Sequence, residues 1–124
     1  TNGTIIIHGD GSQTRDYVYV DDVVNALVTS STAVGVDQQV INIGSGVETS
    51  VLELVRLVRQ VTGRKPEEVY NPLKSGGSDR MCAGIAKAQE KLNYIPLVPL
   101  ETGLRLTIER DPQFKKEIEP KLPA

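Results

Sequence analysis

The alternation of apolar and polar residues predicts three strands in the first half of the chain. Three consecutive isoleucines lie within residues 4–8, and β-branched side chains of this kind favour a strand. Residues 9–12 contain two glycines and predict a turn, after which the alternation over residues 16–20 predicts a second strand. Residues 39–43 predict a third, buried strand that ends at a glycine-containing turn.

A helix is predicted between the second and third of these strands. Asp21 or Asp22 is suited to cap it, because a carboxylate accepts hydrogen bonds from free N–H groups and is favoured by the helix dipole. Gly35 marks the end of this segment. The apolar residues of the helix form one face: Val23, Val24, Leu27 and Val28.

The best-defined element is a helix that begins after Ser50. Ser50 and Glu53 form a capping box, in which the serine side chain accepts from the third N–H group and the glutamate reaches back to the first. Gly63 is expected to end this helix, and a short strand follows near Val69. The apolar residues of the helix repeat at helical spacing: Val51, Leu54, Val55, Val58 and Val61.

The remainder predicts a loop over residues 71–83 and two further helices. The first is short and ends at Asn93, and the second begins near Pro99 and ends before Pro112. Strands that alternate with helices make the chain α/β, with few strands and flanking helices. We expect one folded region over residues 1–112, followed by a charged, proline-containing loose tail over residues 113–124.

Composition excludes several classes of function. The 124 residues fit one ordinary domain, and no apolar run approaches the ~20 residues that span a bilayer. The 14 basic and 16 acidic residues, with aromatic residues at 4% and no tryptophan, argue against a nucleic-acid partner. The chain starts at Thr1 and its only methionine is Met81, so we expect it to be part of a longer polypeptide.

The single histidine and the single cysteine restrict the chemistry further. His8 has no second ligand at metal-binding spacing, so we predict a structural histidine and no metal site. Cys82 cannot form an internal disulfide, and one thiol suits a reducing cytoplasm. No histidine lies beside Cys82 in the sequence, which disfavours a role as nucleophile.

Two glycine pairs have the spacing of a dinucleotide-binding loop without its context. After Gly9-x-Gly11 the pattern continues as strand, and no helix follows whose N-terminus would hold a pyrophosphate. A helix does follow Gly44-x-Gly46, but a third glycine in register is missing. We therefore predict no cofactor-binding residue in either pair.

Tyr70-x-x-x-Lys74 has the spacing of a catalytic tyrosine and the lysine that lowers its pKa. That chemistry requires both side chains on one face of a helix. Pro72 lies between them and disfavours a helix, so we interpret the spacing as coincidence and predict no catalytic residue.

Cations next to glycine-rich turns make anion binding the surviving candidate chemistry. Arg15 is the only Lys or Arg among residues 1–55, which contain seven carboxylates, and Gln13 offers amide donors beside it. Lys74 and Arg80 flank a second turn, and guanidinium groups suit phosphate oxygens through paired donors. The alternative for Arg15 is a structural ion pair with Asp10 or Asp16.

Several blocks of the sequence resemble the NAD-dependent nucleotide-sugar epimerases and dehydratases. These enzymes are extended short-chain dehydrogenase/reductases, of which UDP-glucose 4-epimerase is the best-known member. The resemblance runs in order over about residues 4–110. The blocks that carry it are Gly9–Asp22, Asn42–Gly46, Thr49–Leu54, Arg80–Ala88, Leu92–Pro96 and Leu100–Leu104.

The resemblance implies that the chain is the C-terminal, substrate-binding third of such an enzyme. The family's NAD loop and catalytic Tyr-x-x-x-Lys would lie in a missing N-terminal Rossmann region, which would bind NAD, oxidise the sugar at C4 and reduce it again. The full-length protein would be a homodimer, and this chain alone would bind no NAD and be inactive. The residues implied to bind the nucleotide sugar are Gln13, Arg15, Tyr17, Val47, Lys74 and Arg80.

Two departures from the family pattern leave the sugar and the base open. Lys74-Ser75-Gly76-Gly77 stands where many relatives have Arg-x-Gly-Asp, and Gly84 stands where aspartate often caps the next helix. The leading hypothesis is the substrate-binding region of an epimerase or dehydratase for a UDP- or dTDP-sugar. The alternatives are a stand-alone nucleotide-sugar-binding module without catalysis and a purely structural α/β domain.

Overall fold

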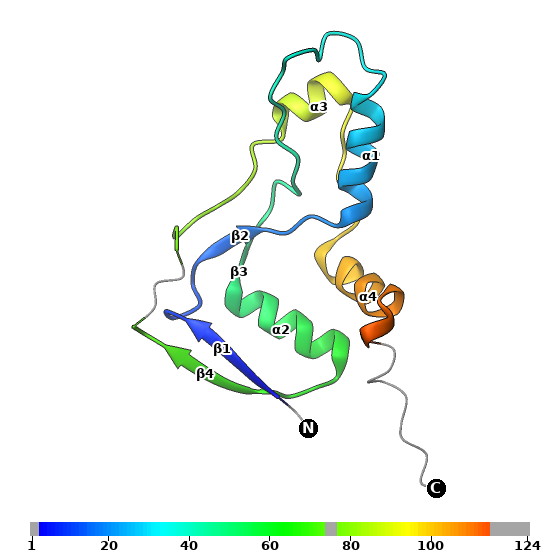
Figure 1. Cartoon of the computed structure of the whole chain (residues 1–124). Helices are drawn as coiled ribbons and strands as arrows, with labels where there is room; N and C mark the ends of the chain where they lie inside the picture. The colour runs from blue at the N-terminus through cyan, green and yellow to red at the C-terminus, as the bar shows by residue number, and fades with distance from the viewer. Residues whose placement is uncertain (1–2, 74–76, 115–124) are drawn as a thin grey trace, which may run out of the picture.

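The computed structural model describes residues 3–73 and 77–114, and Figure 1 shows four helices and four short strands in this part of the chain. In chain order these elements are β1 (Thr4–His8), β2 (Thr14–Asp16), α1 (Val20–Ser30), β3 (Glu48–Ser50), α2 (Val51–Thr62), β4 (Glu67–Asn71), α3 (Ala86–Leu92) and α4 (Leu100–Arg110). Residues 115–124 of the predicted tail lie outside the described residues, so the boundary at residue 112 stays a prediction.

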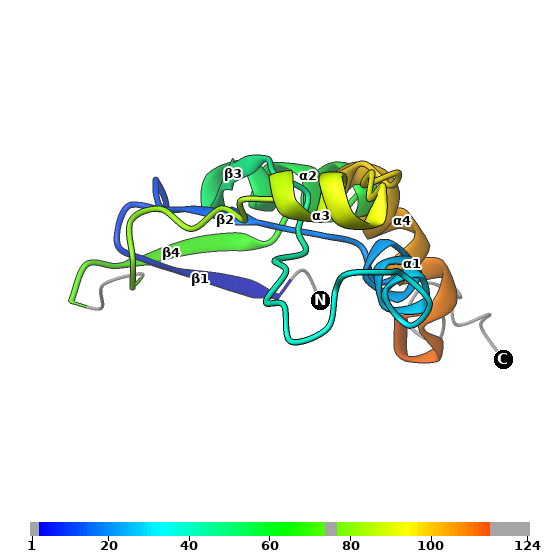
Figure 2. The same cartoon turned by 90° about the horizontal axis from the view of Figure 1, so that it is seen from above.

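The strands form two separate two-stranded sheets. β1 and β4 are parallel, with Ile6 opposite Val69, and the chain between them passes through α2, which lies over this pair (Figure 2). β2 and β3 are antiparallel, with Arg15 opposite Thr49. Among the described strands no sheet has a third member, and a two-stranded sheet in water is marginal unless other elements cover it.

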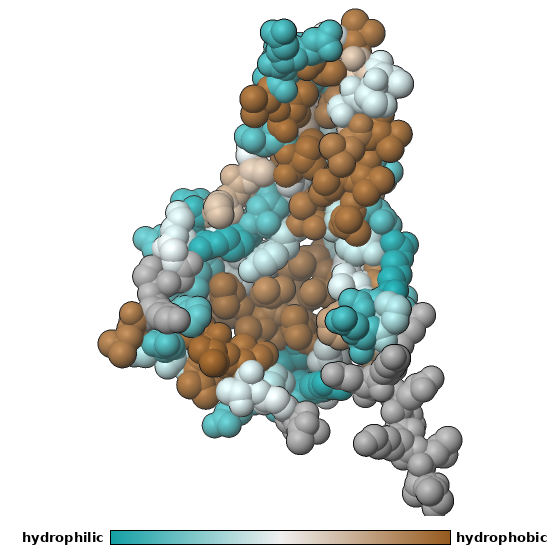
Figure 3. All heavy atoms as spheres, in the orientation of Figure 1, coloured by the Kyte–Doolittle hydropathy of each residue, from teal (hydrophilic) through white to brown (hydrophobic). Residues whose placement is uncertain are grey.

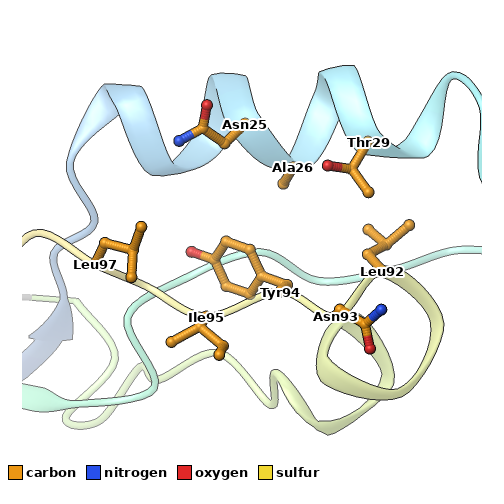
Figure 4. A pocket seen from close by; sticks show the side chains of 8 residues that line it. All are labelled: Asn25, Ala26, Thr29, Leu92, Asn93, Tyr94, Ile95 and Leu97. Atoms are coloured by element: carbon orange, nitrogen blue, oxygen red, sulfur yellow. The ribbon is translucent and has the colours of Figure 1, made fainter.

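The buried side chains form two small groups at opposite ends of the molecule. Ile7 of β1 is 1% exposed, at the end of the molecule that contains β1, β4 and α2 (Figure 1). At the other end, α1 packs on α3 and on the segment that leads to α4 (Figures 1 and 4). Tyr94 is buried there, and its hydroxyl donates to the Gly44 carbonyl at 2.8 Å. The buried members of this second group are Ala26, Ala88, Leu92 and Tyr94.

Several local predictions are confirmed. Ser50 is the N-cap of α2, where its Oγ accepts from the Glu53 N–H at 3.1 Å, and Gly63 ends the helix with φ of 67°. The strand over residues 4–8 and the strand around Val69 are present. The short helix α3 ends at Asn93, whose φ of 49° lies in the left-handed region that asparagine tolerates.

The predicted strand over residues 16–20 is wrong. The observed strand, β2 (Thr14–Asp16), begins two residues earlier and ends four residues earlier, because this stretch pairs with β3. Val20 is already the first residue of α1. Alternation alone did not show where the partner strand would lie, and pairing decides which extended residues become a strand.

The predicted capping of α1 by Asp21 or Asp22 is also wrong. Tyr19 is the N-cap and makes no side-chain cap hydrogen bond. Asp22 is 2% exposed, and its two carboxylate oxygens accept from the Leu97 and Val98 N–H groups, both at 3.1 Å. Asp22 therefore joins α1 to the segment before α4, a long-range role that local sequence does not reveal.

The third predicted strand, over residues 39–43, does not form among the described residues. Ile41 and Ile43 pack against the buried group around Ala26, but no other strand lies beside them. Nor does the apolar face of α1 form part of the core, since Leu27 and Val28 are 64% and 65% exposed. None of the helices described is long and apolar enough to span a bilayer.

Candidate functional site

The segment that contains Arg80 lies directly against β2. The Thr14 N–H donates to the Asp79 carbonyl at 2.9 Å, and the Met81 N–H donates to the Thr14 carbonyl at 3.2 Å. Thr14 and Arg80 are therefore bridge partners in a parallel arrangement. This pairing puts Arg80 next to Thr14 and Arg15, so two cations that are far apart in sequence occupy one region of the molecule.

Arg15 fixes the neighbouring turn from within this region. Its Nη1 donates to the carbonyls of Thr14 and Ser78, both at 2.7 Å, and the residue is half-buried. Gly77 lies close by with φ of 86°, and a Cβ there would lie 3.5 Å from Arg15 Nη2. The guanidinium thus lies between β2 and the 77–80 turn, with part of its surface still reached by water.

Arg80 reaches the solvent and pairs with the strand on the other side of β2. Its Nη2 and Nε donate to one oxygen of Glu48, at 2.8 Å and 3.0 Å, while its side chain stays 76% exposed. The hydrogen bond and negative charge of Glu48 raise the pKa of Arg80. Exposed ion pairs are weak in water, so an incoming anion can compete with Glu48 for this guanidinium.

Gln13, Tyr17 and Val47 lie at the ends of the β2–β3 ladder. Tyr17 directly follows β2 and Val47 directly precedes β3, and because the antiparallel register ends at Asp16 opposite Glu48, both lie at the same end of the ladder. Gln13 precedes β2 at its other end, and its Nε2 donates to the His8 carbonyl at 3.0 Å. Of the six residues predicted to bind substrate, Lys74 lies outside the described residues.

A surface cavity of about 540 Å³ opens beside Gln13, but its charge does not suit a phosphate. Asp10 and Asp79 both line it. Two hydrogen bonds from Ser12 hold the pKa of Asp10 below its ordinary value, so this carboxylate is charged at neutral pH. These two carboxylates make the cavity unfavourable for an anion.

Asp16 organises the backbone around the site, a role that the sequence analysis missed. It accepts from the Ser45 N–H and Oγ at 2.7 Å and 2.6 Å, from the Gly46 N–H at 2.9 Å and from the Ala83 N–H at 3.1 Å. Partial burial raises the pKa of Asp16, but these hydrogen bonds outweigh it and the net shift is downward. One carboxylate thereby joins β2 to two loops.

Gly44 is required by this arrangement. A Cβ at residue 44 would lie 2.5 Å from the Ala83 Cβ and 2.6 Å from Asp16 Oδ2. Packing against Asp16, rather than a dinucleotide, therefore explains the first glycine of Gly44-x-Gly46.

Replacing Gly44 with alanine is expected to destabilise the protein by about 1–3 kcal/mol, because the loop over residues 44–46 must move away from Asp16. Urea unfolding monitored by circular dichroism measures the change. Gly84→Ala is the matched control, since a Cβ at residue 84 meets nothing within 4 Å. Equal effects of the two substitutions would show that Gly44 is not a packing glycine.

The first N–H groups of α2 are used within the protein. The Val51 and Leu52 N–H groups, which would face a pyrophosphate, donate to the carbonyls of Gln13 and Gly11, both at 3.1 Å. A Cβ on Gly11 would lie 2.9 Å from the Leu52 side chain, so this glycine allows α2 to approach the turn. The first residues of α2 therefore do not fit the pyrophosphate of NAD.

The remaining candidate residues, Tyr70 and Cys82, do not have the surroundings that catalysis would require. Tyr70 lies in β4, as expected from its extended context, and a hydrogen bond to Glu68 raises its pKa, which is the opposite of what a tyrosine base requires. Desolvation, followed by the carboxylates of Asp16 and Glu48, raises the pKa of the Cys82 thiol. Over residues 3–73 and 77–114, no group of three or more His, Cys, Asp or Glu side chains could hold a metal ion.

Comparison with known proteins identifies the class to which this fold and site belong. The family model described as GDP-mannose 4,6 dehydratase matches residues 2–107. The UDP-glucose 4-epimerase of Mycolicibacterium smegmatis is 41% identical over 106 residues, which cover 86% of this chain and 34% of that protein. The chain therefore spans about a third of the length of this relative.

Solved structures agree with this assignment. The UDP-glucose 4-epimerase of Thermotoga maritima with UDP-glucose matches with a TM-score of 0.83 and 42% identity, over 95% of this chain and 37% of that one. The UDP-glucuronic acid 4-epimerase of Bacillus cereus, in complex with UDP-glucuronic acid and NAD, matches with a TM-score of 0.79 and 28% identity, again over 95% and 37%.

These matches define the class as the NAD-dependent epimerases and dehydratases of the extended short-chain dehydrogenase/reductases. Within it, the chain belongs to the GDP-mannose 4,6 dehydratase family. The predicted fold class, α/β with few strands and flanking helices, is confirmed.

Proposed function

We propose that the chain is the nucleotide-sugar-binding region of an NAD-dependent epimerase or dehydratase similar to UDP-glucose 4-epimerase. Its ligand would be the diphosphate of a UDP- or dTDP-sugar. The observation that carries this proposal is the pairing of Thr14 with Arg80, because it brings the segment that contains Arg80 alongside β2, which contains Arg15. Relatives of the same fold hold UDP-glucose or UDP-glucuronic acid, which supports a ligand with two phosphates.

In this proposal the two arginines bind the diphosphate and their neighbours position the nucleotide. Arg80 exchanges its exposed pair with Glu48 for a phosphate oxygen, and Arg15 would provide a second guanidinium from β2. Tyr17 and Val47, at one end of the β2–β3 ladder, line the nucleotide side. Gln13 lies at the other end, and Lys74 is proposed as a further ligand on the family resemblance alone.

The redox chemistry would reside outside this chain. NAD, when bound by the native protein, would supply oxidation and reduction of the sugar, and the pKa values of Tyr70 and Tyr94 are raised, which is the opposite of what a tyrosine base requires. We propose that a Rossmann region of the same polypeptide holds NAD, and that the native protein is a homodimer. The share of its relatives that this chain covers supports a longer polypeptide.

The 124-residue chain, purified alone, is expected to show no turnover of UDP-glucose with added NAD, because over residues 3–73 and 77–114 neither glycine pair has the form of a dinucleotide loop and Tyr70 lies in a strand. A coupled assay for UDP-galactose formation measures this, with the native protein as positive control. Turnover by the chain alone, once contaminating enzyme is removed by a second column, would contradict the proposal. The alternative, a stand-alone nucleotide-sugar-binding module, differs in one respect. In that case the 124-residue sequence would not be part of a larger polypeptide.

A further inference from the structure

Val47 is an exposed apolar residue in the polar middle of the molecule. Figure 3 shows hydrophilic residues over the region of β2, with hydrophobic areas above and below it. Val47 directly precedes β3 and is 61% exposed. Packing of its side chain within the protein therefore does little to hold Val47, and its place depends on what holds its backbone.

Two hydrogen bonds in series connect the backbone of Val47 to Asp16. The Val47 N–H donates to Ser45 Oγ at 3.1 Å, and the Ser45 hydroxyl donates to Asp16 Oδ1 at 2.6 Å. A hydroxyl that donates to a carboxylate becomes a better acceptor, so the two bonds strengthen each other. The Ser45 N–H also donates to Oδ1, at 2.7 Å. One carboxylate oxygen of Asp16 thus holds Ser45 and, through it, Val47.

The other oxygen of Asp16 fixes the turn that leads to Val47. Asp16 Oδ2 accepts from the Gly46 N–H at 2.9 Å and from the Ala83 N–H at 3.1 Å. Gly46 has a φ of 71°, in the left-handed region, so the chain changes direction sharply at this residue. Holding its N–H in place fixes the direction in which the chain continues to Val47. Both oxygens of Asp16 therefore act on the same exposed residue.

The two arginines that would bind the diphosphate are held by other contacts. Arg15 donates to the carbonyls of Thr14 and Ser78. The segment that contains Arg80 is joined to Thr14 by two backbone hydrogen bonds, on either side of Arg80. These contacts do not use the carboxylate of Asp16. A change at Asp16 should therefore act on the Val47 side of the ligand site more than on its phosphate side.

We propose that Asp16 is a positioning residue, which through Ser45 and Gly46 sets the place of Val47 against the nucleobase of the ligand. The inference rests on the proposed function, because only there does Val47 line the nucleotide side. A flat base gains from an apolar side chain only at contact distance, and a gap of about 0.5–1 Å already loses about a quarter to a half of the dispersion attraction. Small shifts of Val47 are therefore sufficient to weaken recognition of the base.

Asparagine at residue 16 separates these contacts without changing the size of the side chain. A carboxylate accepts on both sides, whereas an amide accepts only through its oxygen and donates through its nitrogen. In Asp16→Asn the amide nitrogen would face either the donors of Ser45 or those of Gly46 and Ala83. In both orientations one of the two connections to Val47 is lost.

Calorimetry of the native protein with UDP and with inorganic pyrophosphate tests the proposal. Asp16→Asn is expected to weaken the binding of UDP about tenfold and that of pyrophosphate less than about twofold, because pyrophosphate has no base. A merely structural role of Asp16 would lower the melting temperature and weaken both ligands alike. Equal weakening of both ligands, or unchanged binding of UDP, would overturn the proposal.

Ser45→Ala provides a milder variant should Asp16→Asn fail to fold at the assay temperature. It removes only the hydroxyl that lies between Asp16 and Val47. The binding of UDP is expected to weaken about threefold, with pyrophosphate binding unchanged. If Ser45→Ala binds UDP as tightly as the wild type does, the proposal is overturned.

Asp10→Asn is the matched control for the loss of one negative charge. Asp10 likewise accepts from the N–H and the hydroxyl of one serine, Ser12, at 2.9 Å and 2.6 Å, but this contact lies within a single turn. The substitution should not weaken the binding of UDP, and weakening as large as that of Asp16→Asn would contradict the proposal. A wild-type protein that binds neither UDP nor pyrophosphate would instead overturn the proposed function, and the role of Asp16 with it.

Discussion

Replacing Arg15 with alanine is expected to weaken the binding of a UDP-sugar to the native protein by about ten- to a hundredfold. Charge-assisted hydrogen bonds from a guanidinium to phosphate oxygens contribute roughly 1.5–3 kcal/mol, and 1.4 kcal/mol corresponds to a factor of ten in affinity. Arg15→Lys should recover only part of the loss, because an ammonium group cannot make the paired contact. Calorimetry with UDP-glucose measures both variants.

The melting temperature of the Arg15→Ala variant must be measured together with its affinity. Arg15 Nη1 also donates to the Ser78 carbonyl, so alanine removes a contact that holds the 77–80 turn against β2. Arg56→Ala is a suitable control, since this exposed arginine on α2 pairs with Glu53 at 3.6 Å and is not among the residues proposed to bind the ligand. Unchanged affinity together with a lowered melting temperature would assign Arg15 a structural role instead.

Replacing Asp22 with alanine is expected to cost about 3–5 kcal/mol of the free energy of unfolding. The carboxylate is almost fully buried and accepts two backbone hydrogen bonds, and hydrogen bonds to a charged group are worth roughly 1.5–3 kcal/mol each. Alanine leaves the Leu97 and Val98 N–H groups without this acceptor. Asp22→Asn keeps one acceptor oxygen and should lose about half as much.

The neighbouring residue provides the control for this experiment. Asp21 is partly exposed and pairs with Arg110 at 2.7 Å on the surface, where ion pairs contribute little. Asp21→Ala should therefore leave the urea midpoint of the native protein almost unchanged. If the two alanine variants unfold at the same urea concentration, the hydrogen bonds of Asp22 do not hold α1 to the segment before α4.

The elements that the sequence predicted correctly are those with local signals. The capping box of Ser50 and Glu53 and the left-handed turn at Gly63 both act within a few residues, so they defined α2 at both ends. The three isoleucines placed β1 in the same way. The capping of α1 was predicted wrongly because it also relied on a local signal. Aspartate is an ordinary N-cap residue, but the carboxylate of Asp22 accepts a hydrogen bond from the Leu97 N–H, more than seventy positions away.

For the candidate site, residue type suggested which side chains matter but not how they meet. Arg15 stood out by its charge among carboxylates, whereas the contact between β2 and residues 77–81 has no signal in either segment. Asp16 was considered only as an ion-pair partner for Arg15, and the structure gives it four hydrogen bonds from the Ser45–Gly46 turn and Ala83.

The sequence by itself determined the α/β character, the bounds of α2, and the choice of arginine as the candidate anion ligand. These depend on backbone propensity, capping and charge, which are properties of neighbouring residues. Only the tertiary structure decided that Arg80 lies beside Arg15, that Asp22 is buried and that the apolar side of α1 faces outward. Those facts depend on which distant segments pack together, because the direction of a helical face and the partner of a strand are fixed by contacts across the chain.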